Sequence, residues 1–219
     1  MAERPLVRPR DAASLILLRE GKSGLEVLIG RRGKGARFMP GRYVFPGGRI
    51  TASDTRPWLD EAEDGEAARF VALKRAALRE TFEETNLVVG RQLSGRRANG
   101  EAGGSPVEQA YHARGIAPAP DLLRLVGRAI TPTASPIRFH ARFFLADGRY
   151  AVGDIIHSEE LEDLRWHPIA DDMPSMMQNV TKFMLRCAIE AWKGTAPSHP
   201  PLYWHRGRRS LVRHGQPAR

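Results

Sequence analysis

The stretch Arg79-Glu80-Thr81-Phe82-Glu83-Glu84-Thr85-Asn86-Leu87 decides the fold of this 219-residue chain. Residues three and four apart are neighbours on a helix, so Glu80, Glu83 and Glu84 share one helix face. Like charges in this arrangement destabilise a helix by a few tenths of a kcal/mol, roughly 0.2–0.5 per pair. A hard divalent cation such as Mg²⁺ removes this repulsion, because it takes oxygen ligands and bridges carboxylates to substrate phosphates. The alternative interpretation is a solvated acidic face without function.

The acidic stretch ends the longest predicted helix of the chain, which runs from Glu66 to about Thr85. Val71, Leu78 and Phe82 point to one side of this helix, and the three carboxylates point to the opposite side. We therefore expect one face to pack on a sheet while the acidic face lines a cleft. Asn86 tolerates the left-handed conformation that often ends a helix.

A basic, glycine-rich segment precedes the helix. Two apolar runs separated by a turn signal predict a hairpin over residues 12–29, and a short strand follows at residues 42–45. Between residues 31 and 49 the chain has six basic residues and no acidic one. Glycines at Pro46-Gly47-Gly48 permit close backbone approach to a ligand, and arginines fork onto phosphate oxygens. The segment predicts an anion site, with an exposed hairpin loop as the alternative.

The rest of the chain predicts one domain with two insertions. We expect a flexible N-terminus at residues 1–11, a domain over residues 12–193, and a basic tail at residues 194–219. Insertions are expected near residues 49–65, with a helical turn at Pro57–Glu63, and near residues 90–120, with a mobile part at Gly95–Gly104. Apolar patterns predict strands at residues 122–131, 138–146 and 163–167, and helices at residues 106–114 and 179–192.

The formal net charge is +9 and comes from arginine, with 29 Arg against 5 Lys. Such a balance attracts anions, which include phosphate substrates, nucleic acid and acidic membranes, although genome composition would also produce it. No apolar run approaches the roughly 18 residues of a membrane span, and residues 1–10 lack a secretory signal, so we expect a cytoplasmic protein without a membrane partner. The single cysteine, Cys187, excludes an internal disulfide and a cysteine-based zinc cluster.

Taken in order, these elements resemble the Nudix hydrolase family, whose members cleave a diphosphate linked to another group with Mg²⁺ or Mn²⁺ held by a helix. The family box runs Gly, five residues, Glu, seven residues, then Arg-Glu-U-x-Glu-Glu-x-Gly-U, where U is bulky and apolar. Residues 79–87 match its second half except at Thr81 and Asn86. The resemblance implies an α+β fold, an α/β/α sandwich with a mixed central sheet, a catalytic helix and a C-terminal helix. It implies catalytic roles for Arg79, Glu80, Glu83 and Glu84, the three glutamates being the metal ligands.

The first half of the box departs from the family pattern. Counting back from Arg79 puts Gly65 at the glycine and Val71 at the first glutamate, whereas the Pro-Gly-Gly turn ends 17 residues further upstream. An insertion of about that length therefore separates loop and helix, and the first glutamate is missing. Substitutes from the insertion are Glu63, Asp64 or Glu66. The missing acid also motivates an alternative, a non-catalytic ligand-binding protein with the Nudix fold.

A second pattern bears on the substrate. The family branch that acts on coenzyme A carries Leu-Leu-Thr-x-Arg-Ser-x₃-Arg-x₃-Gly-x₃-Phe-Pro-Gly-Gly, and this chain matches at residues 28–29, Arg32, Arg37, Gly41 and residues 45–48. Gly30 and Gly33 replace the threonine and serine. The chain thus resembles the peroxisomal acyl-CoA diphosphatases and their bacterial relatives. This implies cleavage of coenzyme A or acyl-CoA to 3′,5′-ADP and (acyl-)4′-phosphopantetheine, with substrate bound by Arg32, Arg37, Gly47 and Gly48.

Several alternatives stay open at this point. Other Nudix substrates are nucleotide sugars and dinucleoside polyphosphates. The general base is unassigned, and Glu159 and Glu160 are its candidates because they precede a predicted strand. The expected partner is a small-molecule diphosphate and not nucleic acid, although the basic tail leaves RNA binding and the lining of a homodimer as alternatives.

Overall fold

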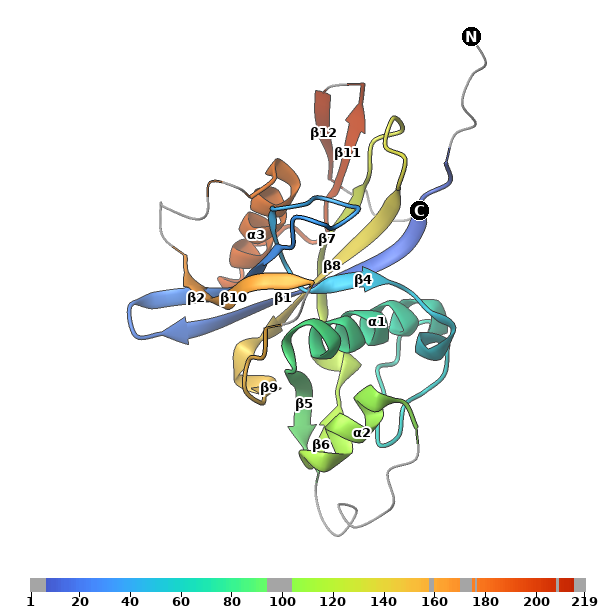
Figure 1. Ribbon diagram of the computed structural model, residues 1–219, viewed down its shortest axis with the longest axis vertical. Helices are drawn as coiled ribbons and strands as arrows, with labels where there is room; N and C mark the ends of the chain where they lie inside the picture. Colours follow the sequence, from blue (N-terminus) through green and yellow to red (C-terminus); the bar gives the residue numbers. More distant parts are fainter. Residues whose placement is uncertain are drawn as a thin grey trace.

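The computed structural model describes residues 7–93, 104–157, 160–169, 175, 177–207 and 209–214. A mixed central sheet carries one helix on each face, and a smaller lobe of strands and one helix lies below it (Figure 1). The predicted α+β sandwich is therefore confirmed. The helices are α1 (Ala68–Thr85), α2 (Pro106–Ala113) and α3 (Asn179–Trp192), with single 3₁₀ turns η1 (Ala52–Thr55), η3 (Pro120–Leu122) and η4 (Gly148–Tyr150).

The central sheet has both parallel and antiparallel pairs. Its order is β10 (Leu161–Pro168), β2 (Gly24–Arg32), β1 (Arg10–Gly21), β8 (Phe139–Asp147), β7 (Arg124–Ile130), β11 (Leu202–Arg206) and β12 (Arg209–Arg213). Two short strands lie off this path: β3 (Tyr43–Val44) pairs with β2, and β4 (Gly47–Arg49) pairs with β1. Strand β1 is parallel to β8, and β7 is parallel to β11. The smaller sheet has the order β6 (Ile116–Pro118), β5 (Val88–Gln92), β9 (Ala151–Val152).

Strand β1 divides the core into two layers. Successive side chains of a strand point to opposite faces, so Leu15 and Leu17 pack on the α1 side while Ile16 and Leu18 pack on the α3 side. All four are fully buried, and each such side chain contributes roughly 1.5–3 kcal/mol. Cys187 lies in the α3 layer, where burial raises the pKa of its thiol to about 11. It is the buried thiol that its apolar surroundings in the sequence predicted.

The predicted hairpin and the end of the long helix are confirmed. Strands β1 and β2 pair through Gly21 and Gly24, although β1 begins at Arg10, inside the segment expected to be flexible. Helix α1 ends at Asn86, which is left-handed (φ 63°) and donates its backbone N–H to the carbonyl of Phe82. This turn leads the chain from α1 into β5 of the smaller lobe.

One expectation about local structure is wrong. The helical turn of the first insertion lies at Ala52–Thr55 and not at Pro57–Glu63, because Asp54 caps the turn by accepting the Thr51 N–H. Within the segment predicted as a basic tail, β11 joins β7 and its Tyr203 packs on Phe183. Such a short ribbon has no long apolar run that would reveal it in the sequence. The predicted mobile part at Gly95–Gly104 lies outside the described residues except for Gly104.

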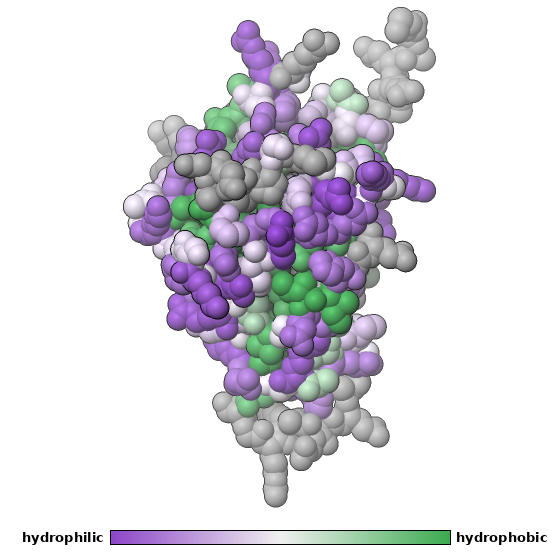
Figure 2. Space-filling model, turned by 60° about the vertical axis from the view of Figure 1, so that its left-hand side comes forward, coloured by the Kyte–Doolittle hydropathy of each residue, from purple (hydrophilic) through white to green (hydrophobic). Residues whose placement is uncertain are grey.

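The surface is dominated by charge. Hydrophilic side chains cover most of the face seen in Figure 2, and apolar groups interrupt them locally. Among the residues that the structure describes, no helix is both long and apolar enough to cross a membrane.

Candidate active site

Helix α1 is enclosed on almost all sides along its middle. Every residue from Val71 to Arg79 is buried, and these include the charged side chains of Lys74, Arg75 and Arg79. The sheet covers one side of the helix, and the segment of residues 51–65, here called the insertion segment, supplies contacts on another. The expectation of one packed face and one open acidic face therefore holds only for the last turns of the helix.

Each buried basic residue of α1 is paired with an acid of the insertion segment. Burying a charge is costly unless it is paired and hydrogen-bonded, so these pairs are what allow the segment to cover the helix. The N···O distances are 2.7 Å for Lys74–Asp64, 2.7 Å for Arg75–Glu61 and 2.9 Å for Arg79–Asp54. The insertion segment is thereby fixed along roughly one and a half turns of the helix that carries the acidic stretch.

Arg79 is the centre of this arrangement. Its Nε and Nη2 donate to the two carboxylate oxygens of Asp54 at 2.9 and 3.1 Å, and Nη1 donates to Glu80 at 2.9 Å and Glu83 at 2.7 Å. Nη2 also reaches the carbonyl of Arg49 at 3.0 Å. Burial acts to lower the pKa of Arg79, but the three carboxylates outweigh it and raise the pKa. Arg79 therefore stays charged and holds two carboxylates of the acidic stretch in place.

Asp54 corrects the sequence interpretation of the box. It is fully buried and lies six residues after Gly48, which is the family spacing from the glycine to the first acid. The acid is thus present as aspartate, and the 17 extra residues lie after it rather than before it. Glu63 and Glu66 are exposed, and Asp64 binds Lys74, so none of the three proposed substitutes contacts Arg79. Counting forward from Gly48 instead of back from Arg79 would have found Asp54.

The glycines of β4 lie directly against the acidic stretch. The Gly47 N–H donates to Glu84 Oε2 at 2.9 Å. A Cβ placed on Gly48 would lie 2.4 Å from the carboxyl carbon of Glu80, so a larger residue there would displace the Glu80 carboxylate. The backbone of both glycines thus lies close to the protein's own carboxylates. Their close approach to a ligand stays a prediction.

Burial perturbs two of the three carboxylates. It raises the pKa of Glu84 to about 8 and also raises the pKa of Glu80, and their negative neighbours add to the effect. The side chain of Glu83 is 49% exposed. Burial in the protein interior favours the protonated form of the Glu80 and Glu84 carboxyl groups. A bound cation would compensate for this effect by stabilising the ionised form. We call Glu80, Glu83 and Glu84 the acid cluster.

The two predicted phosphate-binding arginines occupy different environments. Arg32 ends β2, and its positive charge acts against the rise in the pKa of Glu84. Its Nε is buried and has no hydrogen-bond partner within the described ranges. Arg37 is exposed on the loop between β2 and β3, whose Phe38 packs edge-on against Phe139. The structure therefore brings Arg32 to the cluster but shows no contact between the cluster and Arg37.

One of the two candidate bases also lies near the cluster. Glu160 raises the pKa of both Glu80 and Glu84 through its charge. Its backbone carbonyl accepts the N–H of Gly33 at 3.3 Å, which connects the start of β10 to the basic loop. Glu159 lies outside the described residues. The charge of a fourth carboxylate, from a different part of the chain, therefore acts on the cluster.

The donor set suits a hard cation. All candidate donors are carboxylate oxygens, which Mg²⁺ and Mn²⁺ prefer, and burial raises the pKa of two of them, Glu80 and Glu84. In the part of the chain that is described, no three such side chains yet converge on one point. The reason is visible in their contacts, since Arg79 holds Glu80 and Glu83 while Gly47 holds Glu84.

Comparison with solved structures identifies the family. A NUDIX hydrolase from Alicyclobacillus acidocaldarius is 31% identical, with a TM-score of 0.59, and the match covers 89% of this chain and 99% of that one. The chain belongs to the Nudix hydrolase family. This enzyme class cleaves diphosphate linkages, so the chain is a Nudix diphosphatase. None of the general family models matches the chain.

More distant Nudix structures share the fold. A MutT NUDIX hydrolase from Burkholderia pseudomallei is 18% identical with a TM-score of 0.50, over 82% of this chain and 98% of that one. The NUDIX domain of Shewanella oneidensis NrtR, solved with ADP ribose, is 14% identical with a TM-score of 0.51, over 88% of this chain and 94% of that one.

The missing first acid of the box had motivated a non-catalytic interpretation. Because this acid is present as Asp54, that observation no longer holds.

Proposed function

We propose that this Nudix hydrolase cleaves the diphosphate of coenzyme A or acyl-CoA, giving 3′,5′-ADP and (acyl-)4′-phosphopantetheine, with Mg²⁺ or Mn²⁺ as cofactor. The coenzyme A assignment rests on the pattern from residue 28 to Gly48, which places Arg32 four residues after its start and ends at the two glycines. The single observation that supports the proposal is that Arg32 and the two glycines of this pattern all act on the acid cluster. The charge of Arg32 acts on Glu84, and Gly47 and Gly48 lie against Glu84 and Glu80.

Glu80, Glu83 and Glu84 are the residues that would hold the cation. When bound, it supplies positive charge to the phosphate oxygens and lowers the pKa of a water molecule. The chain's own residues then provide position and complementary charge. Arg79 fixes the orientation of Glu80 and Glu83, and Asp54 fixes Arg79 through a two-point contact.

The basic side chains and Glu160 complete the proposed site. Arg32 binds a phosphate oxygen beside the cluster, and Arg37 closes on the substrate from the exposed loop. Glu160 takes the proton of the attacking water, because its charge acts on the cluster, yet it is exposed on its loop and engages none of the cluster's hydrogen bonds in the described residues. Its exposure lets it exchange that proton with solvent.

A substrate panel tests the proposal. Coenzyme A, ADP-ribose and diadenosine tetraphosphate are incubated separately with the enzyme in Mg²⁺, in Mn²⁺ and in EDTA, and the products are separated by chromatography. We expect metal-dependent formation of 3′,5′-ADP from coenzyme A at the highest kcat/KM. A higher kcat/KM for ADP-ribose or the dinucleotide would overturn the coenzyme A assignment and favour the alternative substrates. Equal turnover in EDTA would overturn the proposal that Mg²⁺ or Mn²⁺ is the cofactor.

A further inference from the structure

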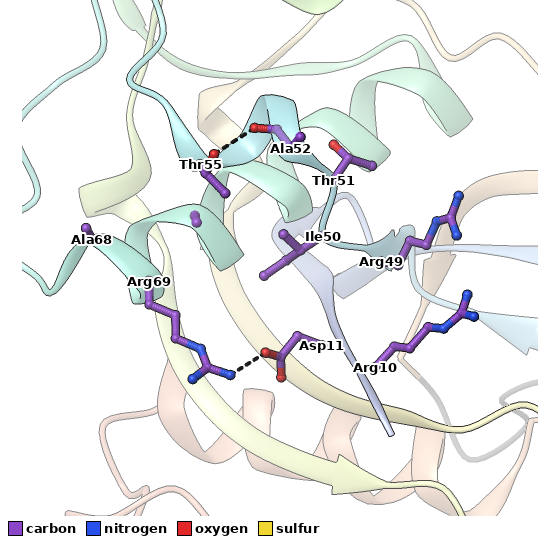
Figure 3. A pocket seen from close by; sticks show the side chains of 10 residues that line it. Arg10, Asp11, Arg49, Ile50, Thr51, Ala52, Thr55, Ala68 and Arg69 are labelled. Carbon is purple, nitrogen blue, oxygen red and sulfur yellow. Dashed lines mark hydrogen bonds and ion pairs between the residues drawn. The ribbon is translucent and has the colours of Figure 1, made fainter. Parts of the chain in front are cut away.

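A large hollow lies beside the site described above. It has a volume of about 870 Å³ and lies between the start of β1, the end of β4, η1 and the first turns of α1 (Figure 3). Ligand pockets of proteins have volumes of about 300–1,000 Å³. Apolar side chains of Ile50, Ala52 and Ala72 line it together with Thr51 and Thr55. The hollow is therefore large enough for a nucleoside and offers apolar surface for a ring.

The charges around the hollow do not balance. Its only acidic lining residue is Asp11, which already accepts from Arg69 at 2.6 Å and from Arg142. Arg10 and Arg49 also line it, and neither has an acidic partner among the residues described. Three arginines and one carboxylate thus line the hollow, and a fourth arginine, Arg142, binds that same carboxylate. This excess of positive charge favours a bound anion.

Arg10 and Arg49 are arranged as a pair. Ala12 is the register partner of Arg49, so Arg10 is the diagonal neighbour of Arg49 on the same face of the sheet. Both side chains extend in the same direction from one border of the hollow (Figure 3). Two guanidinium forks that extend from neighbouring strands in the same direction suit a phosphate monoester, which presents three oxygens and up to two negative charges.

We infer that the hollow takes the nucleoside end of the substrate and that Arg10 and Arg49 bind a phosphate monoester on its ribose. This inference rests on the proposed function, in which that group is the 3′-phosphate of coenzyme A. Arg49 directly follows Gly48, which touches Glu80. Ala72 precedes Glu80 by eight residues, about 12 Å along the helix at 1.5 Å per residue. A diphosphate at the acid cluster therefore places the ribose and its second phosphate at the mouth of the hollow.

Two measurements test the inference separately from the proposed function. In the first, calorimetry compares binding of 3′,5′-ADP and 5′-AMP to the wild type and to Arg10→Ala, Arg49→Ala and the control Arg209→Ala, an exposed arginine on β12. We expect the wild type and the control to prefer 3′,5′-ADP by roughly tenfold or more, the strength of a charge-assisted contact. Each hollow variant should lose most of this preference.

The second measurement uses turnover. For Arg10→Ala and Arg49→Ala, we expect KM to rise several-fold more for coenzyme A than for dephospho-coenzyme A, with Arg49→Lys intermediate. If coenzyme A is not hydrolysed but the 3′,5′-ADP preference depends on both arginines, the substrate assignment fails and the subsite stands. Equal effects on both ligands, or no preference in the wild type, would overturn the subsite even if coenzyme A is hydrolysed.

Discussion

Basic side chains have different surroundings at the insertion segment and in the basic loop of residues 31–42. Against the insertion segment, Lys74, Arg75 and Arg79 are buried, and each is paired with an acid. In the basic loop, Arg31 pairs with Glu162 at 2.8 Å, but Lys34, Arg37 and Arg42 are exposed and have no acidic partner among the described residues. The same residue types therefore serve to position the catalytic helix in one region and stay available to a ligand in the other. The net charge of +9 alone does not distinguish these roles.

Arg79→Ala should have the largest effect, because it removes the partner of a fully buried carboxylate. We expect a loss of about 3–5 kcal/mol in the free energy of unfolding, the cost of leaving Asp54 buried and unpaired. Urea denaturation measures it. The matched control is Arg69→Ala on the same helix, whose exposed ion pair should contribute only about 0–1 kcal/mol. Equal losses in both variants would mean that burial of the pair does not matter.

Glu83→Ala should separate catalysis from folding. The side chain is 49% exposed, so the free energy of unfolding should change little. Metal-dependent turnover should fall roughly a hundredfold or more, since a ligand of a cation worth several kcal/mol is lost. The control is Glu63→Ala, an exposed acid of the insertion segment, which should keep full activity. Near-wild-type turnover of Glu83→Ala would remove Glu83 from the site.

The paired and unpaired regions also show what sequence can predict. Hydrophobic periodicity sufficed for α1, α3 and the first hairpin, because residues such as Val71 and Leu78 keep a fixed spacing. The ion pairs joining the insertion segment to α1 were missed, since Arg79 and Asp54 are 25 residues apart and no local pattern connects them. Asp54 itself was predictable from its spacing to Gly48. The β11–β12 ribbon was not, because its contact with β7 depends on tertiary packing.

Stability of the metal-free enzyme should fall as pH rises. The folded pKa of Glu84, about 8, lies above its usual value of 4.5, so the native state binds an extra proton between these values and loses stability as pH rises through that window. We expect a loss of up to about 2 kcal/mol between pH 6 and pH 7.5, at 1.36 kcal/mol per unit. Urea denaturation in EDTA measures it. Glu84→Gln should flatten this dependence, and an unchanged slope would assign it to other groups.

The smallest expected effects lie in the basic loop. Arg32→Ala should raise KM for the diphosphate substrate roughly tenfold, the value of one charge-assisted contact, and Arg37→Ala should raise it less. Neither should greatly alter the free energy of unfolding, in contrast to Arg79→Ala. Steady-state kinetics measure KM, and Lys34→Ala on the same loop is the charge-matched control. A KM for Arg32→Ala no higher than that of the control would place Arg32 outside the substrate site.

The central claim is that the acid cluster is the metal site. Direct measurement of cation binding tests this claim. Electron paramagnetic resonance counts free Mn²⁺ during titration of the wild type, Glu84→Gln and the control Glu63→Ala. We predict saturable binding by the wild type and the control, and an affinity weakened about tenfold or more in Glu84→Gln, as expected for the loss of a buried charged ligand. Equal affinity in Glu84→Gln, or no saturable binding by the wild type, would contradict the account.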